Sequence, residues 1–138
     1  MDGSVVVDAS IWVARLIPQD IFHDPCRAWL EAQRGRNVWL VSPTLLLAEV
    51  GGAISRRTSE PHLGERAAEV LKNLPGLRLV EMDHRLVQVA VDLAVRLGLR
   101  GADSFYVAVA QTLELPLATL DEDQRSRAES LVMVVEIM

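Results

Sequence analysis

The stretch Ser4-Val5-Val6-Val7-Asp8 decides the fold, because an unbroken β-branched run of this length is typical of a strand buried on both faces of a parallel sheet. Similar short apolar runs recur along the chain, and helical segments separate them. The alternation predicts an α/β fold: a three-layer sandwich in which a mainly parallel five-stranded sheet has helices on both faces. The expected strands are residues 4–7, 38–41, 77–82, 117–120 and 131–135.

Capping signals predict where several helices begin and end. Asp24-Pro25 and Ser42-Pro43 each place a capping residue before a proline, which is typical of a helix start. Asp83 is expected to cap a further helix, and Gly98 to end it. No element is assigned to residues 9–23. The expected helices are residues 25–33, 43–57, 59–74, 84–97, 102–113 and 122–130.

Length and composition indicate one folded unit. With 138 residues, 50% of them hydrophobic and 24% charged, the chain is expected to form a single domain over residues 1–138. It has no apolar run of the roughly eighteen residues that a membrane span needs, and no basic N-terminal segment of a signal peptide. Its single cysteine, Cys26, cannot form an internal disulfide, so we expect a cytoplasmic protein with no membrane partner.

The net charge by itself argues against a nucleic-acid partner. Nineteen acids and fourteen bases give −5, so the surface as a whole should repel a phosphate backbone. All the bases except Lys72 are arginines, however, and a guanidinium group can bind a phosphate locally.

Three aspartates fall where the expected fold would bring them together. Asp8 and Asp121 directly follow the first and fourth strands, and Asp103 lies near a helix start just after Gly101. Because the carboxyl ends of parallel strands meet at one edge of the sheet, these side chains should gather there. Taken singly, each aspartate could instead be only a helix cap.

Glu49 needs a different explanation, because it lies in the middle of a predicted helix within the apolar stretch Leu45–Val50. A carboxylate in such a place is costly to desolvate unless something pairs with it. An ion pair with an arginine is the structural alternative to a functional role.

A cluster of these four acids would favour a divalent cation. Carboxylates about 4–6 Å apart repel by a few kcal/mol per pair at an effective dielectric constant of about 20, and a bound ion would relieve that repulsion. Oxygen ligands without a Cys/His cluster suit Mg²⁺ or Mn²⁺. Phosphate esters are the usual substrates of such sites.

Four motifs, in this order, resemble the PIN-domain ribonucleases, and the chain is similar in size to their VapC-type toxins. The resemblance runs from residue 5 to about residue 135 and implies the PIN-like fold. It also implies RNA cleavage, a cognate antitoxin, a homodimer, and Asp8, Glu49, Asp103 and Asp121 as the catalytic residues and the ligands of Mg²⁺ or Mn²⁺. The motifs are Val5–Ser10, Ser42-Pro43 with Glu49, Gly101–Ser104 running into Ala108–Ala110, and Ala118–Asp121.

Residues near these acids suggest supporting roles. Ser10 and Thr119 stand where the family often has small hydroxyl residues, and they could orient a carboxylate or a metal-bound water. Asp123 is a possible supplementary ligand, although a solvated helix start explains it as well. Gly51-Gly52 interrupts the Glu49 helix, which either close helix packing at a dimer interface or a tolerated kink would explain.

An acidic metal pocket would reconcile the negative net charge with an RNA substrate, provided that arginines line the approach to it. Each nearby arginine could hold an RNA phosphate or be an ordinary surface residue. The candidates are Arg56, Arg100, Arg125 and Arg127.

We therefore expect a Mg²⁺- or Mn²⁺-dependent endoribonuclease, in which metal-activated water attacks phosphorus and leaves a 5′-phosphate and a 3′-hydroxyl. The alternative is a catalytically silent PIN-like module that binds RNA or a partner protein. Two other phosphoryl-transfer folds fit less well. A haloacid-dehalogenase-like phosphatase needs an aspartate where Ser10 stands, and a receiver domain needs a late strand-end lysine, which Lys72 cannot supply.

Overall fold

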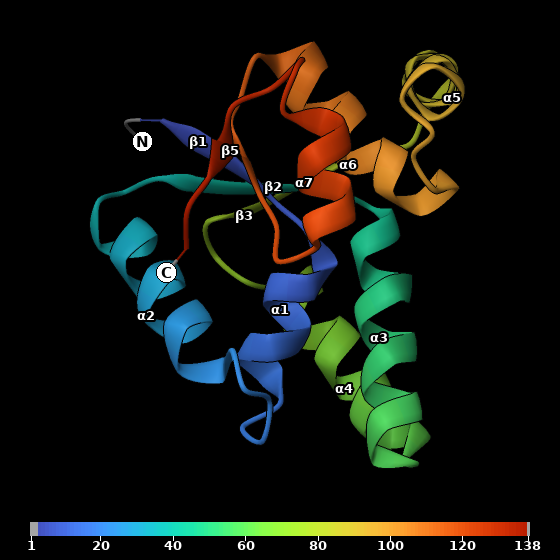
Figure 1. Ribbon diagram of the computed structural model, residues 1–138. Coiled ribbons are helices and arrows are strands. Elements are labelled where there is room, and N and C mark those ends of the chain that lie inside the picture. The colour runs from blue at the N-terminus through green and yellow to red at the C-terminus, as the bar shows by residue number, and fades with distance from the viewer. Residues whose placement is uncertain (1–2, 138) are drawn as a thin grey trace.

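The first strand, β1, lies at the centre of a five-stranded sheet in which every neighbouring pair is parallel (Figure 1). The structure is a computed structural model that describes residues 3–137. Val5, Val6 and Val7 are buried, as expected for a strand covered on both faces. The strands, in the spatial order β3-β2-β1-β4-β5, are β1 (Ser4–Val7), β2 (Trp39–Pro43), β3 (Leu77–Val80), β4 (Leu117–Ala118) and β5 (Val134–Val135).

Helices cover both sides of this sheet. In Figure 1, α1 to α4 lie on one side, and α5 and α6 lie on the other. Helix α6 packs on β1, β2 and β4, and its segment 106–110 is buried throughout. Within residues 3–137, no helix combines the length and the hydropathy that crossing a membrane requires. The helices are α1 (Ala9–Leu16), α2 (His23–Gly35), α3 (Leu45–Thr58), α4 (Pro61–Lys72), α5 (His84–Leu97), α6 (Gly101–Leu113) and α7 (Glu122–Ala128).

The predicted three-layer architecture is confirmed, with one helix more than expected. Helix α1 follows β1 directly and had no counterpart among the predicted helices. It buries Ile11, Trp12 and Ala14, so it lacks the polar face that marks an amphipathic helix in a sequence.

Two predicted helix starts are wrong, and two other capping predictions are confirmed. Helix α2 begins at His23, before Asp24. The Ser42-Pro43 pair belongs to the end of β2, and the Ser42 hydroxyl donates 2.6 Å to the carbonyl oxygen of Val7 instead of capping a helix. Asp83 does cap α5, by accepting a hydrogen bond from the amide of Leu86, and Gly98 ends that helix with a φ of 69°.

A close crossing between α3 and α4 accounts for one of the two glycines that interrupt the Glu49 helix. A Cβ atom on Gly51 would lie 3.3 Å from the carbonyl oxygen of Gly64, and one on Gly64 would collide with the carbonyl oxygen of Gly51. The backbones of the two helices can approach this closely because neither residue has a side chain. The close helix packing that Gly51 permits is therefore with α4 of the same chain, and not at a dimer interface.

Candidate active site

Asp8 is a buried carboxylate at the carboxyl end of the central strand. The residue is 5% exposed. It caps α1, and one of its oxygens, Oδ2, accepts three hydrogen bonds: from the Ser10 amide at 3.2 Å, the Ser10 hydroxyl at 2.7 Å and the Thr119 hydroxyl at 3.1 Å. The other carboxylate oxygen, Oδ1, takes part in none of these three bonds. The hydrogen bonds from Ser10 and Thr119 thus all fall on one carboxylate oxygen of Asp8.

Ser10 and Thr119 also connect Asp8 to the segment that follows β4. The Ser10 hydroxyl accepts a hydrogen bond from the amide of Leu120, and the Thr119 hydroxyl accepts one from the amide of Asp121. Each hydroxyl therefore donates to Asp8 and accepts from a backbone amide of the segment that follows β4. The orienting role expected of both residues has a direct geometric basis.

Asp121 is a helix cap as well, but its two oxygens have separate partners. Oδ1 accepts hydrogen bonds from the amides of Asp123 and Gln124 at the start of α7. Oδ2 accepts one from the guanidinium group of Arg100 at 2.7 Å. The side chain is therefore held from two sides.

Glu49 lies in the second turn of α3 and pairs with a phenol. The Tyr106 hydroxyl donates a hydrogen bond of 2.6 Å to Glu49 Oε1. The ion pair with an arginine that we considered for Glu49 is not what the structure shows, because its hydrogen-bond partner is neutral. Tyr106 is fully buried, so this donor has a fixed position.

Sequence analysis overlooked Tyr106, although a signal was present. Tyr106 follows Asp103 by three residues, and residues three apart lie on the same face of a helix. The face of α6 that carries Asp103 is therefore the face from which Tyr106 reaches Glu49. Gln124 was overlooked in the same way: its side-chain amide donates to the backbone carbonyl of Asp103.

The four carboxylates influence one another electrostatically. Burial raises the pKa of Asp8, and hydrogen bonds from Ser10 and Thr119 only partly oppose that rise. Burial is also the main cause that raises the pKa of Glu49, and the charges of Asp8 and Asp103 add to it. The pKa of Asp103 is raised by burial first and then by Asp8 and Asp121, against the effect of Arg100. Such a cluster carries excess negative charge that a cation would stabilise.

This donor set fits a hard divalent cation in chemical type and in charge, since carboxylate oxygens surround it. Within the described residues 3–137, the acids do not stand as a ready group of three metal ligands. Instead, Arg100 donates to Asp103 at 3.2 Å and to Asp121 at 2.7 Å. In the arrangement described here, a guanidinium group therefore bridges two of the four acids.

Other candidates from the sequence have partners elsewhere. The side chain of Asp123 is exposed and pairs with Arg127 at 2.9 Å. Arg125 pairs with Glu136 at 2.6 Å, and Arg56 is exposed on α3. Of the arginines considered as phosphate ligands, Arg100 thus makes direct contacts with two of the four acids, Asp103 and Asp121.

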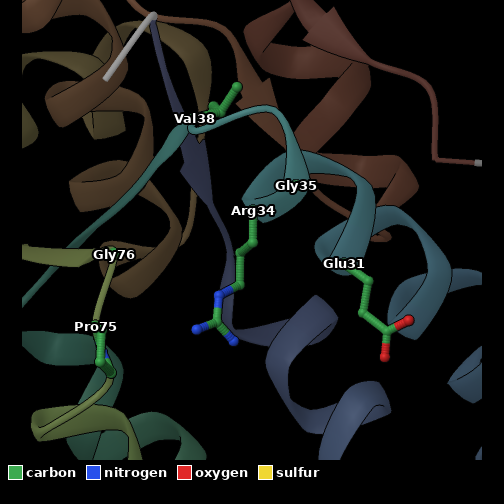
Figure 2. A pocket seen from close by; sticks show the side chains of 6 residues that line it. All are labelled: Glu31, Arg34, Gly35, Val38, Pro75 and Gly76. Carbon is green, nitrogen blue, oxygen red and sulfur yellow. The ribbon is translucent and has the colours of Figure 1, made fainter.

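A cavity at the opposite, amino edge of the sheet offers a different environment. It has a volume of about 430 Å³, and none of the four acids lines it. Figure 2 shows Arg34 of α2 pointing into this space, beside the turn that precedes β3. The chemistry of the acids, and not the depth of a cavity, therefore identifies the candidate site. The lining residues are Glu31, Arg34, Gly35, Val38, Pro75 and Gly76.

Comparisons with solved structures show a fold shared over nearly the whole chain. VapC20 of Mycobacterium tuberculosis, described as a sarcin-ricin loop cleaving toxin, superposes with a TM-score of 0.80 at 19% identity, covering 96% of this chain and 99% of that one. FitAcB from Neisseria gonorrhoeae gives 0.70 at 21% identity, covering 96% and 97%. VapBC2 from Rickettsia felis, bound to a promoter DNA fragment, gives 0.71 at 15% identity, covering 94% and 96%.

Sequence comparison identifies the family. Among curated protein sequences, none matches the chain significantly. The family model of the PIN domain matches residues 5–130, a range that contains all four acids, strands β2, β3 and β4, and all of β1 except its first residue. The chain therefore belongs to the PIN-domain family.

Proposed function

We propose that this protein is a Mg²⁺- or Mn²⁺-dependent endoribonuclease, with Asp8, Glu49, Asp103 and Asp121 as its metal ligands and catalytic residues. One observation supports the proposal: the charges of Asp8 and Asp103 raise the pKa of Glu49, and those of Asp8 and Asp121 raise the pKa of Asp103, so acids from four separate segments influence one another near the carboxyl edge of the sheet. The mutual repulsion of these negative charges is unfavourable, and a bound divalent cation would relieve it. The similarity to VapC-type structures supports the same conclusion.

The side chains divide the chemical work. A divalent ion bound here would supply positive charge to the phosphate and acidify a water molecule. Ser10 and Thr119 hold Asp8 with one oxygen occupied, so its other oxygen keeps a defined direction. Tyr106 does the same for Glu49 through Oε1. Fixed carboxylates of this kind can orient an attacking water and accept its proton.

The partners we propose are RNA as substrate, a cognate antitoxin, and a second copy of the chain in a homodimer. Three structures that share the fold, VapBC2 from Rickettsia felis, FitAB, and a complex from Klebsiella pneumoniae, are of toxin–antitoxin assemblies. An antitoxin that covers the acids would keep the nuclease inactive. We propose that the nuclease and its antitoxin are located in the cytoplasm. We also propose that residues 1–138 of the nuclease fold as one domain.

The test is RNA cleavage by the purified protein with Mn²⁺ or Mg²⁺, with excess EDTA, and by the Asp8→Asn variant. We expect products with 5′-phosphate and 3′-hydroxyl ends, no cleavage in EDTA, and a loss of at least about 100-fold in Asp8→Asn, which loses a charged ligand. Asp92→Asn is the matched control, because Asp92 pairs with Arg96 on exposed α5. Full activity in EDTA would contradict the metal mechanism. A folded protein that binds RNA but never cleaves it would favour the alternative of a silent binding module.

A further inference from the structure

Arg100 occupies a distinctive position, immediately before α6 and beside the acids. Its backbone is extended, with φ −64° and ψ 150°, and its side chain is 71% exposed. Its Nε donates to Asp103 Oδ2 at 3.2 Å, and its Nη2 donates to Asp121 Oδ2 at 2.7 Å. One flexible guanidinium group therefore bridges acids from two different segments.

The oxygen that Arg100 binds on Asp121 is the one that a metal would need. Oδ1 of Asp121 already accepts two amide hydrogen bonds that cap α7. Oδ2 is the oxygen free of that capping role, and Arg100 holds it. A cation that binds Asp121 without breaking the cap must therefore bind at Oδ2, where the like charge of the Arg100 guanidinium group repels it.

The contact has the properties of a temporary one. Exposed ion pairs are screened by water and contribute little net stability, so displacing this guanidinium group costs little. The neighbouring arginines in the described part of the chain are placed differently: Arg125 pairs with Glu136, and Arg127 pairs with Asp123. Arg100 thus supplies positive charge to the acid cluster from a position it can easily leave.

We propose that Arg100 is an internal counter-cation that exchanges with the divalent ion. Its guanidinium group bridges Asp103 and Asp121 while the metal is absent, and it moves away from these two carboxylates when the metal binds. The inference rests on the metal site of the proposed function, and it adds a competitor that belongs to the chain itself. Arg100 is accordingly a positioning residue that lowers metal affinity.

Isothermal titration with MnCl₂ tests the exchange on the purified wild type, Arg100→Gln and Arg96→Gln. Arg96 is the matched control, because it forms a similarly exposed pair with Asp92 at 2.9 Å, outside the acid cluster. We expect Arg100→Gln to bind Mn²⁺ about three- to tenfold more tightly, since no internal cation must first leave, and Arg96→Gln to bind as the wild type does. The Mn²⁺ affinity of Arg100→Lys should lie between those of the wild type and Arg100→Gln, because lysine keeps the positive charge but cannot bridge two carboxylates as a planar guanidinium group does.

Thermal unfolding supplies a second readout that does not depend on catalysis. In EDTA, Arg100→Gln should melt at a lower temperature than the wild type, and Mn²⁺ should raise its melting temperature by more. Equal or weaker Mn²⁺ binding by folded Arg100→Gln would overturn the exchange and leave the proposed metal site intact. Absence of Mn²⁺ binding in both proteins would overturn the exchange together with the metal site.

Discussion

The two halves of the acid cluster are held by opposite kinds of donor. Asp8 and Glu49 accept hydrogen bonds from neutral hydroxyl groups, those of Ser10 and Thr119 on one and that of Tyr106 on the other. Asp103 accepts one from the charged side chain of Arg100, and so does Oδ2 of Asp121, whose Oδ1 is held by two backbone amides. The neutral donors are buried or half-buried, whereas the cation is exposed.

This difference separates orientation from charge compensation. A neutral hydroxyl fixes the direction of a carboxylate but leaves its charge in place, which keeps the need for a cation. A guanidinium group compensates charge but can leave. We therefore interpret the Asp8–Glu49 half as the part of the candidate site that is held in place by buried or half-buried donors, and the Asp103–Asp121 half as the part that, under the proposed exchange, would respond to a divalent ion.

Removing the phenol from the Asp8–Glu49 half should have the largest effect. Tyr106→Phe deletes the hydroxyl that holds Glu49, so we expect Mn²⁺ affinity and RNA cleavage to fall by about 10- to 100-fold, as is typical when a residue that orients a metal ligand is lost. Titration calorimetry and a cleavage assay measure both. Ser104→Ala is the control, because its hydroxyl lies on the same helix but donates to the carbonyl of Gly101. Unchanged Mn²⁺ affinity in Tyr106→Phe would show that Glu49 needs no such support.

Thr119→Val should have a smaller effect on the same half. Asp8 keeps both hydrogen bonds from Ser10, so we expect Mn²⁺ affinity to fall by no more than about tenfold. Loss of the bond to Asp8 and of the acceptor for the Asp121 amide should cost about 1–3 kcal/mol of unfolding free energy. Thr58→Val removes a hydroxyl that donates to the carbonyl of Ile54, outside the cluster, and serves as the control in urea unfolding. If Thr119→Val lost more Mn²⁺ affinity than Tyr106→Phe, the Thr119 hydroxyl would be the more important of these two donors for metal binding.

The smallest effect is a dependence of stability on pH in the metal-free protein. The pKa values of Asp8, Glu49 and Asp103 are raised in the folded state, so unfolding releases protons from these groups between their ordinary and raised values. Their contribution to the unfolding free energy therefore falls as pH rises from about 4 through the raised pKa values and is then constant. In EDTA, Asp8→Asn should be more stable than the wild type at pH 7.5, and the difference should shrink towards pH 4. A difference that grows towards pH 4 would contradict the raised pKa of Asp8.

Local patterns predicted the sheet and the positions of the four acids, because each acid stands at a strand end, at a helix start or inside an apolar helix. They could not predict the partners. Tyr106 and Glu49 are 57 residues apart, and Thr119 and Asp8 are 111 apart, so these contacts depend on how the strands are ordered. The error at Ser42 has the same origin, since its hydroxyl has a distant acceptor in β1 and not a nearby helix to cap.

The crossing of α3 and α4 has a consequence for how this protein can vary. Gly51 lies two residues after Glu49 on α3, so a shift of α3 relative to α4 would also move the helix that carries this carboxylate. A methyl group on Gly64 of α4 would have to push the two helices apart, and this displacement would also shift Glu49 on α3. Gly64 is therefore expected to tolerate substitution poorly, although it bears no functional group, whereas a Cβ atom on Gly51 would need only a small adjustment.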